Sequence, residues 1–293
     1  MVAPITFSLD LEDHRADKSG PKRYPENTRR VLDFLGERGV RGTFFVVGQV
    51  AESEPGLIQE ISEQGHEIAF HSHAHRPLTN SNAQEFRADA EKGRALLEEL
   101  TAKPVSGYRA PVFSLTPESR WAVDVLGELG FTYSSSVLGA ANPLHGFPGV
   151  PTTPFRWPNG LLEIPVPLGG IGPLKLPYLG GIYLRYLPRP VVRHLRTKAP
   201  PGHVPWTYCH PYDFDAEEPF GLIDGAPLWA SVLLWMNRRG SFNKLEAILA
   251  DGAAPPFIEQ VEQGRYADVP VHDPGSGDQP RQRGTQPVGE ADR

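Results

Sequence analysis

Short apolar runs alternate with amphipathic segments from residue 5 to residue 137. In the clearest amphipathic segment, 83–100, apolar residues recur three or four positions apart, the spacing that gathers them on one helix face. The run 42–48 is continuously apolar, which is typical of a strand covered on both faces. The predicted strands are 5–11, 42–48, 66–70, 105–110 and 131–137, and the predicted helices are 27–39, 55–65, 83–100 and 117–130. This alternation predicts an α/β fold with parallel strands joined by right-handed crossovers.

The regular alternation ends near Leu138. Residues 139–190 are rich in proline and glycine, and they contain one predicted strand, 161–166. An irregular segment of this length inside a compact domain is usually functional. Regular structure is expected again as a strand at 204–212 and as helices at 226–238 and 242–250. We therefore predict one catalytic domain, 1–265, with a loop-rich insertion at 139–190 and a disordered polar tail at 266–293.

Length and composition narrow the class of protein. A chain of 293 residues suits an α/β barrel, which commonly occupies ~250 residues as one domain. The net charge is −6 and no run of lysine and arginine occurs, so a nucleic-acid partner is not expected. Cys209 is the only cysteine, which excludes an internal disulfide and a thiolate-rich zinc site.

The start of the sequence also bears on location. It lacks the charged and apolar regions of a secretory leader. No stretch reaches the ~20 apolar residues of a transmembrane helix. We therefore expect a cytoplasmic protein without a transmembrane segment.

The most informative pair of residues is His71 and His75, which follow the predicted strand 66–70. Two imidazoles four residues apart, on a turn that leaves a strand, can point at one divalent metal ion. The acidic group Asp10, Glu12 and Asp13 ends the first predicted strand in the same way. Because the carboxyl ends of parallel strands meet at one rim, these side chains are expected to lie together.

Two further residues fall at predicted strand ends, Arg109 in R-A-P and His210 in H-P-Y. The order D-x-E-D, H-x-x-x-H, R-A-P and H-P-Y resembles the NodB-type polysaccharide deacetylases, carbohydrate esterase family 4. It is most similar to the exopolysaccharide-associated branch. The resemblance extends from about Ile5 to Leu249. It implies a distorted (β/α)7 barrel, a single domain, and hydrolysis of the N-acetyl group of an amino sugar.

The resemblance also implies roles for individual residues. Asp10 matches the general base, Arg109 the residue that orients it, and His210 the general acid. His71 and His75 match the metal-binding imidazoles. We assign substrate contacts to Ser72, Pro111, Trp157 and Tyr212.

The chemistry of an acetamide fits this set of residues. A cation held by two imidazoles and one carboxylate would polarise the carbonyl and lower the pKa of its water towards ~7. Zn²⁺ suits these donors best, and Co²⁺ or Ni²⁺ are alternatives.

Two positions leave alternatives open. Strand alternation puts Asp10 and Glu12 on the same face, which favours Glu12 as the third metal ligand. Asp13 competes with it if the chain turns directly after Leu11. Relatives often carry aspartate at the position of Ser134, and its loss here is expected to lower the pKa of His210 or to change substrate preference.

The sequence thus predicts a metal-dependent carbohydrate N-deacetylase that releases acetate from an N-acetylglucosamine-type glycan. A cytoplasmic location favours a lipid-linked or nucleotide-linked intermediate as its substrate. The alternative is a cyclic-amide or allantoin-type amidohydrolase on the same scaffold. The sequence leaves open the sugar and its linkage, the native metal and the oligomeric state.

Overall fold

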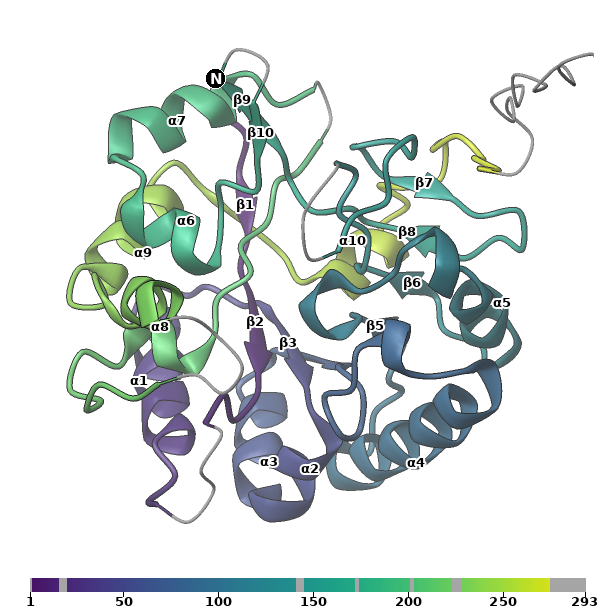
Figure 1. The fold of residues 1–293 in the computed structure, drawn as a ribbon, viewed down its shortest axis with the longest axis horizontal. Coiled ribbons are helices and arrows are strands. Elements are labelled where there is room, and N and C mark those ends of the chain that lie inside the picture. Colours follow the sequence, from purple (N-terminus) through teal and green to yellow (C-terminus); the bar gives the residue numbers. More distant parts are fainter. Residues whose placement is uncertain are drawn as a thin grey trace, which may run out of the picture.

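A seven-stranded sheet lies at the centre of the computed structural model, which describes residues 2–15, 20–140, 145–171, 174–200, 203–222 and 228–274 (Figure 1). The neighbouring strands from β2 to β8 are parallel, and β7 pairs antiparallel with β8. The strands, in the order in which they neighbour one another, are β2 (Ser8–Leu11), β3 (Thr43–Val46), β4 (Glu67–Phe70), β5 (Gly107–Tyr108), β6 (Tyr133–Ser134), β8 (Leu162–Glu163) and β7 (Phe155–Arg156).

The ring of strands continues beyond β2 through residues 204–209. The backbone N–H of Asp10 donates to the carbonyl of Cys209 at 2.8 Å, and the N–H of Cys209 donates to the carbonyl of Ser8 at 3.1 Å. These contacts are isolated bridges and not the long strand predicted at 204–212. Strand β1 (Ile5–Thr6), which precedes β2 in the chain, pairs in parallel with β11 (Ala253–Ala254). The distorted barrel in a single α/β domain is confirmed.

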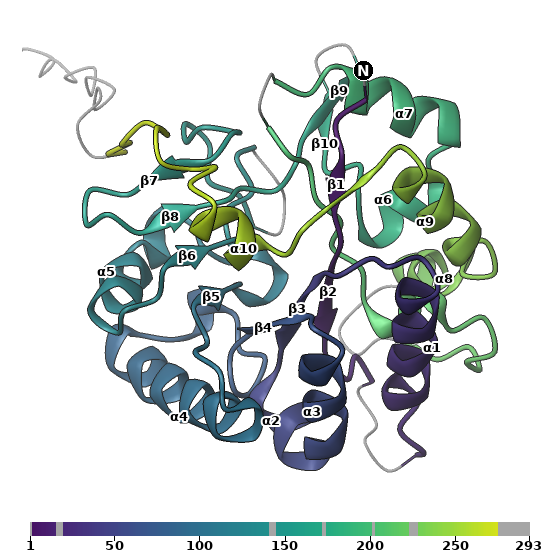
Figure 2. The same cartoon turned by 180° about the vertical axis from the view of Figure 1, so that it is seen from behind.

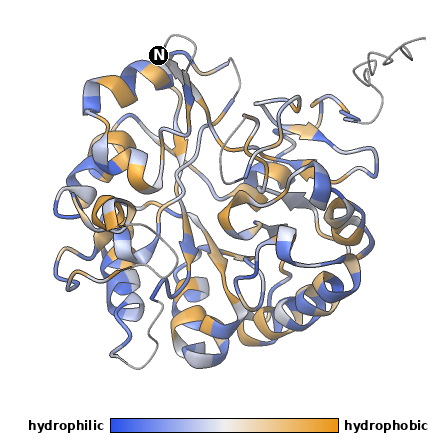
Figure 3. Cartoon of the chain, viewed as in Figure 1, coloured by the Kyte–Doolittle hydropathy of each residue, from blue (hydrophilic) through white to orange (hydrophobic). Residues whose placement is uncertain are grey.

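Helices surround the strands, as seen from both sides (Figure 2). Figure 3 shows apolar residues toward the strands and polar residues on the outer faces of helices such as α4. Within the described ranges, no helix is long and apolar enough to cross a membrane. The helices are α1 (Tyr24–Gly36), α2 (Gly48–Ser53), α3 (Pro55–Glu63), α4 (Ala83–Thr101), α5 (Trp121–Glu128), α6 (Gly181–Tyr186), α7 (Arg189–Thr197), α8 (Leu228–Trp235), α9 (Ser241–Leu249) and α10 (Phe257–Glu262).

Helix α4 shows how local sequence fixes an element beside the site. Asn82 caps its first turn, because the side-chain oxygen accepts from the N–H groups of Gln84 and Glu85 at 3.1 and 3.0 Å. Its apolar face buries Phe86, Ala90, Gly93 and Leu97. Gly93 is required for close approach, since a Cβ atom there would lie 2.2 Å from the Phe70 ring. Helix α4 therefore packs directly on β4, the strand that His71 follows.

The segment 139–190 is more regular than the sequence predicts. Besides β7 and β8, it contains the hairpin of β9 (Gly169–Ile171) and β10 (Leu174–Leu176), helix α6 and the start of helix α7. These elements are short, and short elements give too few repeats for periodicity to identify them. The same reason explains why α2, α10 and β11 were not predicted.

The polar tail begins later than predicted. Residues 266–274 pack on the domain: the Tyr266 ring is buried and its hydroxyl donates to Gln260 at 3.2 Å. The N–H of His272 donates to the carbonyl of Arg156 at 2.8 Å, which extends the edge at β7. The remaining part of the predicted tail, 275–293, lies outside the described residues.

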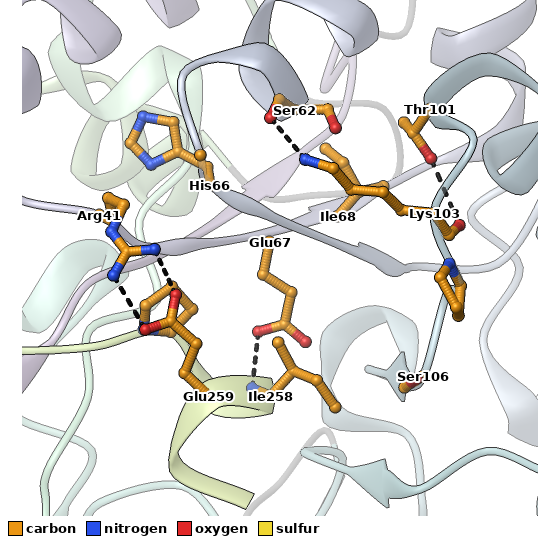
Figure 4. A pocket seen from close by; sticks show the side chains of 13 residues that line it. Arg41, Ser62, His66, Glu67, Ile68, Thr101, Lys103, Ser106, Ile258 and Glu259 are labelled. Carbon is orange, nitrogen blue, oxygen red and sulfur yellow. Dashed lines mark hydrogen bonds and ion pairs between the residues drawn. The ribbon is translucent and has the colours of Figure 1, made fainter. Parts of the chain in front are cut away.

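Glu67 links the start of β4 to helix α10, at the end of the barrel opposite to the strand ends that carry His71 (Figure 4). Its carboxylate accepts from Thr43 Oγ1 at 2.7 Å, from Tyr133 Oη at 2.7 Å and from the N–H of Ile258 at 3.0 Å. A pocket opens around it, with Arg41, His66, Lys103 and Glu259 among its lining residues. None of the predicted site residues lines this pocket, so we interpret Glu67 as a structural tie.

Glu67 is expected to make the stability of the fold depend on pH. Burial raises its pKa from 4.5 to about 7, so the folded chain binds this proton more tightly than the unfolded chain. Its contribution is therefore lost as pH rises from about 4.5 to about 7. Glu67→Gln should flatten the free energy of unfolding over this range, as measured by urea titration at several pH values. If the free energy of unfolding changes between pH 4.5 and pH 7 by the same amount in Glu67→Gln as in the unmodified chain, Glu67 is not the source of the pH dependence.

Candidate active site

Glu12, His71 and His75 lie together at the carboxyl ends of β2 and β4. One ligand atom from each residue lies within 4.8 Å of the others. A carboxylate oxygen of Glu12 is in direct contact with Nε2 of His75, and the two imidazole rings are 5.1 Å apart. Glu12 and His71 are buried, whereas His75 is half-buried. This is the three-residue cluster that strand alternation in the sequence favours.

Asp13, the alternative ligand, is turned toward Arg15. Its two carboxylate oxygens accept from Nε and Nη2 of Arg15, both at 2.9 Å. It does not belong to the cluster formed by Glu12, His71 and His75 among the described residues. The inclusion of Asp13 among the metal ligands is therefore wrong, because the chain beyond Glu12 turns away to bind Arg15.

The protonation of His71 and Glu12 suits a divalent cation, whereas, despite partial burial, the carboxylate of Glu12 raises the pKa of His75, so that a cation would have to displace the proton of that ring. Nδ1 of His71 is 2.8 Å from the carbonyl of Arg109 and donates to it, which leaves the lone pair of Nε2 available. Burial lowers the pKa of His71 to about 4, so the ring is neutral at pH 7. Burial opposes the charge on Glu12, but His75 outweighs it and holds the pKa of Glu12 below its usual value. Two imidazoles and an ionised carboxylate are donors that Zn²⁺ accepts.

Asp10 is held by the buried guanidinium of Arg109. Nη1 of Arg109 donates to Oδ1 of Asp10 at 2.5 Å and to Oγ of Ser8 at 3.0 Å, and Nη2 donates to Oγ of Ser135 at 3.2 Å. The ring of Phe45 lies 3.8 Å from the guanidinium carbon. This set of contacts fixes the rotamer of Asp10 and leaves its second oxygen, Oδ2, directed at the site. The prediction that Arg109 orients Asp10 agrees with this geometry.

His210 lies on the other side of Asp10. Its Nε2 is 3.9 Å from Oδ2 of Asp10 and 4.0 Å from Oε1 of Glu12. Its Nδ1 donates to Oδ2 of Asp213 at 3.1 Å, and its backbone N–H donates to the same oxygen at 2.8 Å. The other oxygen of Asp213 forms an ion pair with Nε of the buried Arg185 at 3.0 Å. These contacts orient the ring so that Nε2 faces the site.

The pKa of His210 is raised to about 9. Burial alone would lower it, but the hydrogen bond to Asp213 and the carboxylates of Glu12 and Asp10 outweigh the burial. The pKa of His210 is therefore high although the chain carries Ser134, and the expected effects of serine in place of aspartate there stay predictions. Ser134 is buried and donates to Oγ of Ser136 at 2.8 Å, and Asp213 provides the carboxylate instead.

Asp213 and Arg185 are further functional candidates, which the sequence patterns do not single out. The local signal for Asp213 is its spacing, three residues after His210 in HPYD. That spacing lets one carboxylate cap the short helix η4 (Pro211–Phe214) and bind the imidazole. Arg185 carries no comparable signal, because it comes from the separate helix α6.

The four residues assigned to substrate contact have different positions. Tyr212 is half-buried and stacks on His210, with ring centroids 4.7 Å apart. Ser72 and Pro111 are buried in the two loops that carry His71 and Arg109. Trp157 is fully buried, and its Nε1 donates to Glu163 at 3.3 Å. The assignment of Trp157 to sugar contact is therefore wrong, since its ring belongs to the core.

Backbone strain is concentrated around the site. Six non-glycine residues in the described chain have positive φ, and four of them lie in these loops: Ser72, His75, Val112 and Phe113. Positive φ is rare for a β-branched residue such as Val112, whose value is 50°. Such strain persists where the surrounding packing enforces it, and it is frequent at functional sites.

Two family descriptions match the chain in succession. Residues 17–134 match "Polysaccharide deacetylase", and residues 135–257 match "Domain of unknown function (DUF3473)". The first match contains His71, His75 and Arg109, and the second contains His210 and Asp213. The candidate site therefore draws on both matched regions and on Asp10 and Glu12, which precede the first of them.

Curated relatives match part of the chain. The peptidoglycan-N-acetylglucosamine deacetylase of Bacillus cereus is 28% identical over 153 residues, which are 47% of this chain and 54% of the relative. The chitooligosaccharide deacetylase of Sinorhizobium fredii is 36% identical over 103 residues, 35% of this chain and 45% of the relative. The match thus spans about half of each relative.

Solved structures agree on the fold over nearly the whole chain. A protein of Mycobacterium smegmatis assigned to the polysaccharide deacetylases has a TM-score of 0.61 and 22% identity, and 93% of each chain is covered. A CE4 family pseudoenzyme from Bacillus anthracis has a TM-score of 0.50 and 13% identity, over 93% of this chain and 68% of the other. Because the fold also carries a pseudoenzyme, any function has to be argued from the site.

Proposed function

We propose that this chain, which belongs to the polysaccharide deacetylase family, hydrolyses the N-acetyl group of an amino sugar in a glycan, with a divalent metal ion. The observation that carries the proposal is the position of the Asp10 carboxylate. Its Oδ2 is 3.9 Å from Nε2 of His71 on one side and 3.9 Å from Nε2 of His210 on the other. A carboxylate base thus stands between a cluster of metal-ligand type and an imidazole acid.

Asp10 is suited to accept a proton. Arg109 occupies one of its oxygens and keeps the carboxylate in a single orientation, while Oδ2 remains directed at the site. In the proposed reaction, Oδ2 takes a proton from the attacking water as the water oxygen bonds to the acetyl carbon. Asp10 becomes neutral when it accepts this proton, and the buried guanidinium of Arg109 remains hydrogen-bonded to it.

His210 is suited to donate the second proton. Its pKa of about 9 keeps the ring protonated at neutral pH, and Asp213 occupies Nδ1 so that the proton on Nε2 faces the site. The carbon–nitrogen bond breaks as Nε2 transfers this proton to the nitrogen. The products are acetate and the free amine of the sugar.

Glu12, His71 and His75 would hold the cation, which supplies polarisation of the acetyl carbonyl and greater acidity of the water. Zn²⁺ is the proposed ion, since two imidazoles and one carboxylate are usual donors for it. Co²⁺ and Ni²⁺ prefer similar donors and are the alternatives.

A pair of neighbouring carboxylates tests the proposed metal centre. Glu12→Gln should weaken Zn²⁺ binding at least ~100-fold, because it removes a ligand and not only a supporting contact. Asp13→Asn is the matched control, and it should leave Zn²⁺ affinity unchanged because Asp13 binds Arg15. The measurements are calorimetric titration with Zn²⁺ and acetate release from a chitooligosaccharide, with and without chelator. A larger loss of Zn²⁺ affinity in Asp13→Asn than in Glu12→Gln would refute the assignment of Glu12 as the ligand. Chelator-resistant activity on a cyclic amide would favour the alternative amidohydrolase.

A further inference from the structure

Large apolar side chains are exposed in one region of the surface, on and next to α8. In the described chain, six of the eight exposed large hydrophobic residues belong to 220–236. Trp229 is 70% exposed, Leu222 67% and Leu228 62%. The docking surface, as we define it, consists of Phe220, Leu222, Leu228, Trp229, Leu233 and Met236. Contiguous apolar surfaces on monomeric proteins usually mark an interaction site.

The backbone of this surface is firmly attached to the domain. Nη1 of Arg185 donates to the carbonyls of Leu234 and Met236 at 2.9 and 2.8 Å. The hydroxyl of Tyr186 donates to the carbonyl of Leu233 at 2.9 Å. The exposed side chains are therefore presented on a fixed helix, which carries no charged residue along its length, LWASVLLW.

The segment that carries α6 and α7 is basic. Between Ile164 and Tyr212 the sequence has six lysine and arginine residues and neither aspartate nor glutamate, although the whole chain has a net charge of −6. Arg189, Arg193 and Lys198 on and after α7 are exposed, as is Arg239 beyond α8. Helices α6, α7 and α8 lie along one side of the domain, on the left in Figure 1. Glu217 is the only exposed carboxylate among the described residues from 213 to 239.

Two buried arginines join the α8 region to the candidate active site. Arg238, directly after the surface, is ion-paired with Glu218, and its guanidinium lies 5.5 Å from the centre of the Tyr212 ring. Tyr212 stacks on His210. Arg185, which binds the end of α8, is also the ion-pair partner of Asp213. The end of α8 is therefore packed against the residues that support the acid imidazole.

We propose that α8 and the adjoining Phe220 and Leu222 insert into the headgroup region of an anionic phospholipid bilayer, with the exposed basic residues facing the lipid phosphates. An apolar surface with tryptophan and flanking arginine and lysine is the combination that binds such an interface. Helix α8 has eight residues, which is too short to span the bilayer. Docking would hold the domain that carries the candidate active site at the membrane, and this consequence, which rests on the proposed function, points to a glycan carried on a lipid as the substrate.

Another segment of this chain is a poor occupant for the surface. Residues 275–293 contain a single aliphatic residue of substantial size, Val288, among polar and charged neighbours. Such a segment cannot replace the apolar contacts that Trp229 and Leu228 would gain in lipid. A second copy of the chain is an alternative occupant, and the experiment separates it from lipid.

The test is co-sedimentation of the full chain with vesicles of phosphatidylcholine alone or mixed with phosphatidylglycerol. Binding to the mixed vesicles is expected to decrease with salt and to fall at least ~tenfold in Trp229→Glu. Val271→Glu is the matched control, because Val271 is 68% exposed outside the docking surface. Leu222→Asp gives a second variant on the surface, and circular dichroism checks that each variant is folded.

Each outcome decides between the occupants. Loss of binding in Trp229→Glu and Leu222→Asp, with Val271→Glu unchanged, supports the proposal. Failure of the unmodified chain to bind either vesicle, or equal losses in all three variants, overturns it. A dimer in analytical ultracentrifugation that Trp229→Glu dissociates, without vesicle binding, assigns the surface to a second copy. Vesicle binding is measured without substrate, so it can be read even if acetate release is absent and the proposed function fails.

Discussion

Replacing Asp10 with asparagine is expected to reduce kcat for acetate release by ~10²- to 10⁴-fold, the usual contribution of a general base. The substitution keeps the size of the side chain and an oxygen that Arg109 can bind, but it removes the group that accepts the proton of water. The loss should appear in kcat and not mainly in KM, because the base acts on the transition state.

The experiment needs controls for folding and for metal. The buried Arg109 loses a charged partner in Asp10→Asn, which destabilises the fold, so thermal unfolding has to be measured in parallel. Zn²⁺ content should remain close to that of the unmodified chain, because Asp10 is not one of the three clustered ligands. Asp13→Asn, three positions along the same segment, should retain full activity. Activity of Asp10→Asn within about threefold of the unmodified chain would rule out Asp10 as the base.

His210→Gln is expected to cause a loss of similar size, ~10²- to 10⁴-fold in kcat, because the leaving nitrogen is no longer protonated by a positioned acid. The effect should be smaller for an activated substrate whose leaving group departs without a proton. Comparing an acetylated aryl amine of low basicity with a chitooligosaccharide measures this difference. Equal losses on the two substrates would argue against His210 as the acid.

The pH profile tests the same assignment through Asp213. An acid with a pKa of about 9 is protonated below that pH, so activity should fall as pH rises through about 9. Asp213→Asn removes the main partner that raises the pKa of His210, and the alkaline limb should therefore move to lower pH. The measurement is kcat against pH for the two proteins. An unmoved limb would show that Asp213 has only a structural role.

The first half of the fold could be predicted from sequence because its elements are long and repeat regularly. Helix α4 spans several turns, and its apolar spacing and its asparagine cap agree with one another. The elements of 139–190 are two to six residues long for the most part, and some of their pairing partners are remote. Tyr208 pairs with Gly180, for example, and Arg156 pairs with Val271, contacts that no local pattern indicates.

The candidate site likewise has features that the sequence predicts and features that it does not. Asp10, His71, Arg109 and His210 each lie at or just after the end of a predicted strand, and strand ends of a parallel sheet converge on one rim. Their convergence was therefore implied by the order of elements. The choice between Glu12 and Asp13 was not, because it depends on where the chain turns after β2 and on the position of Arg15. Trp157 was misassigned for a related reason, since aromatic residues in a proline-rich segment serve both cores and surfaces.

The sequence by itself determined the parallel α/β architecture, the chemistry of the site and the family resemblance, because these follow from local periodicity and from residue types at strand ends. Only the tertiary structure decided which carboxylate joins His71 and His75, that Asp213 and Arg185 orient His210, and that α8 exposes its apolar side chains beside the site. These three features depend on contacts between remote segments and on what remains uncovered after packing. Such contacts are set by the free energy of the whole fold, and no stretch of the chain encodes them alone.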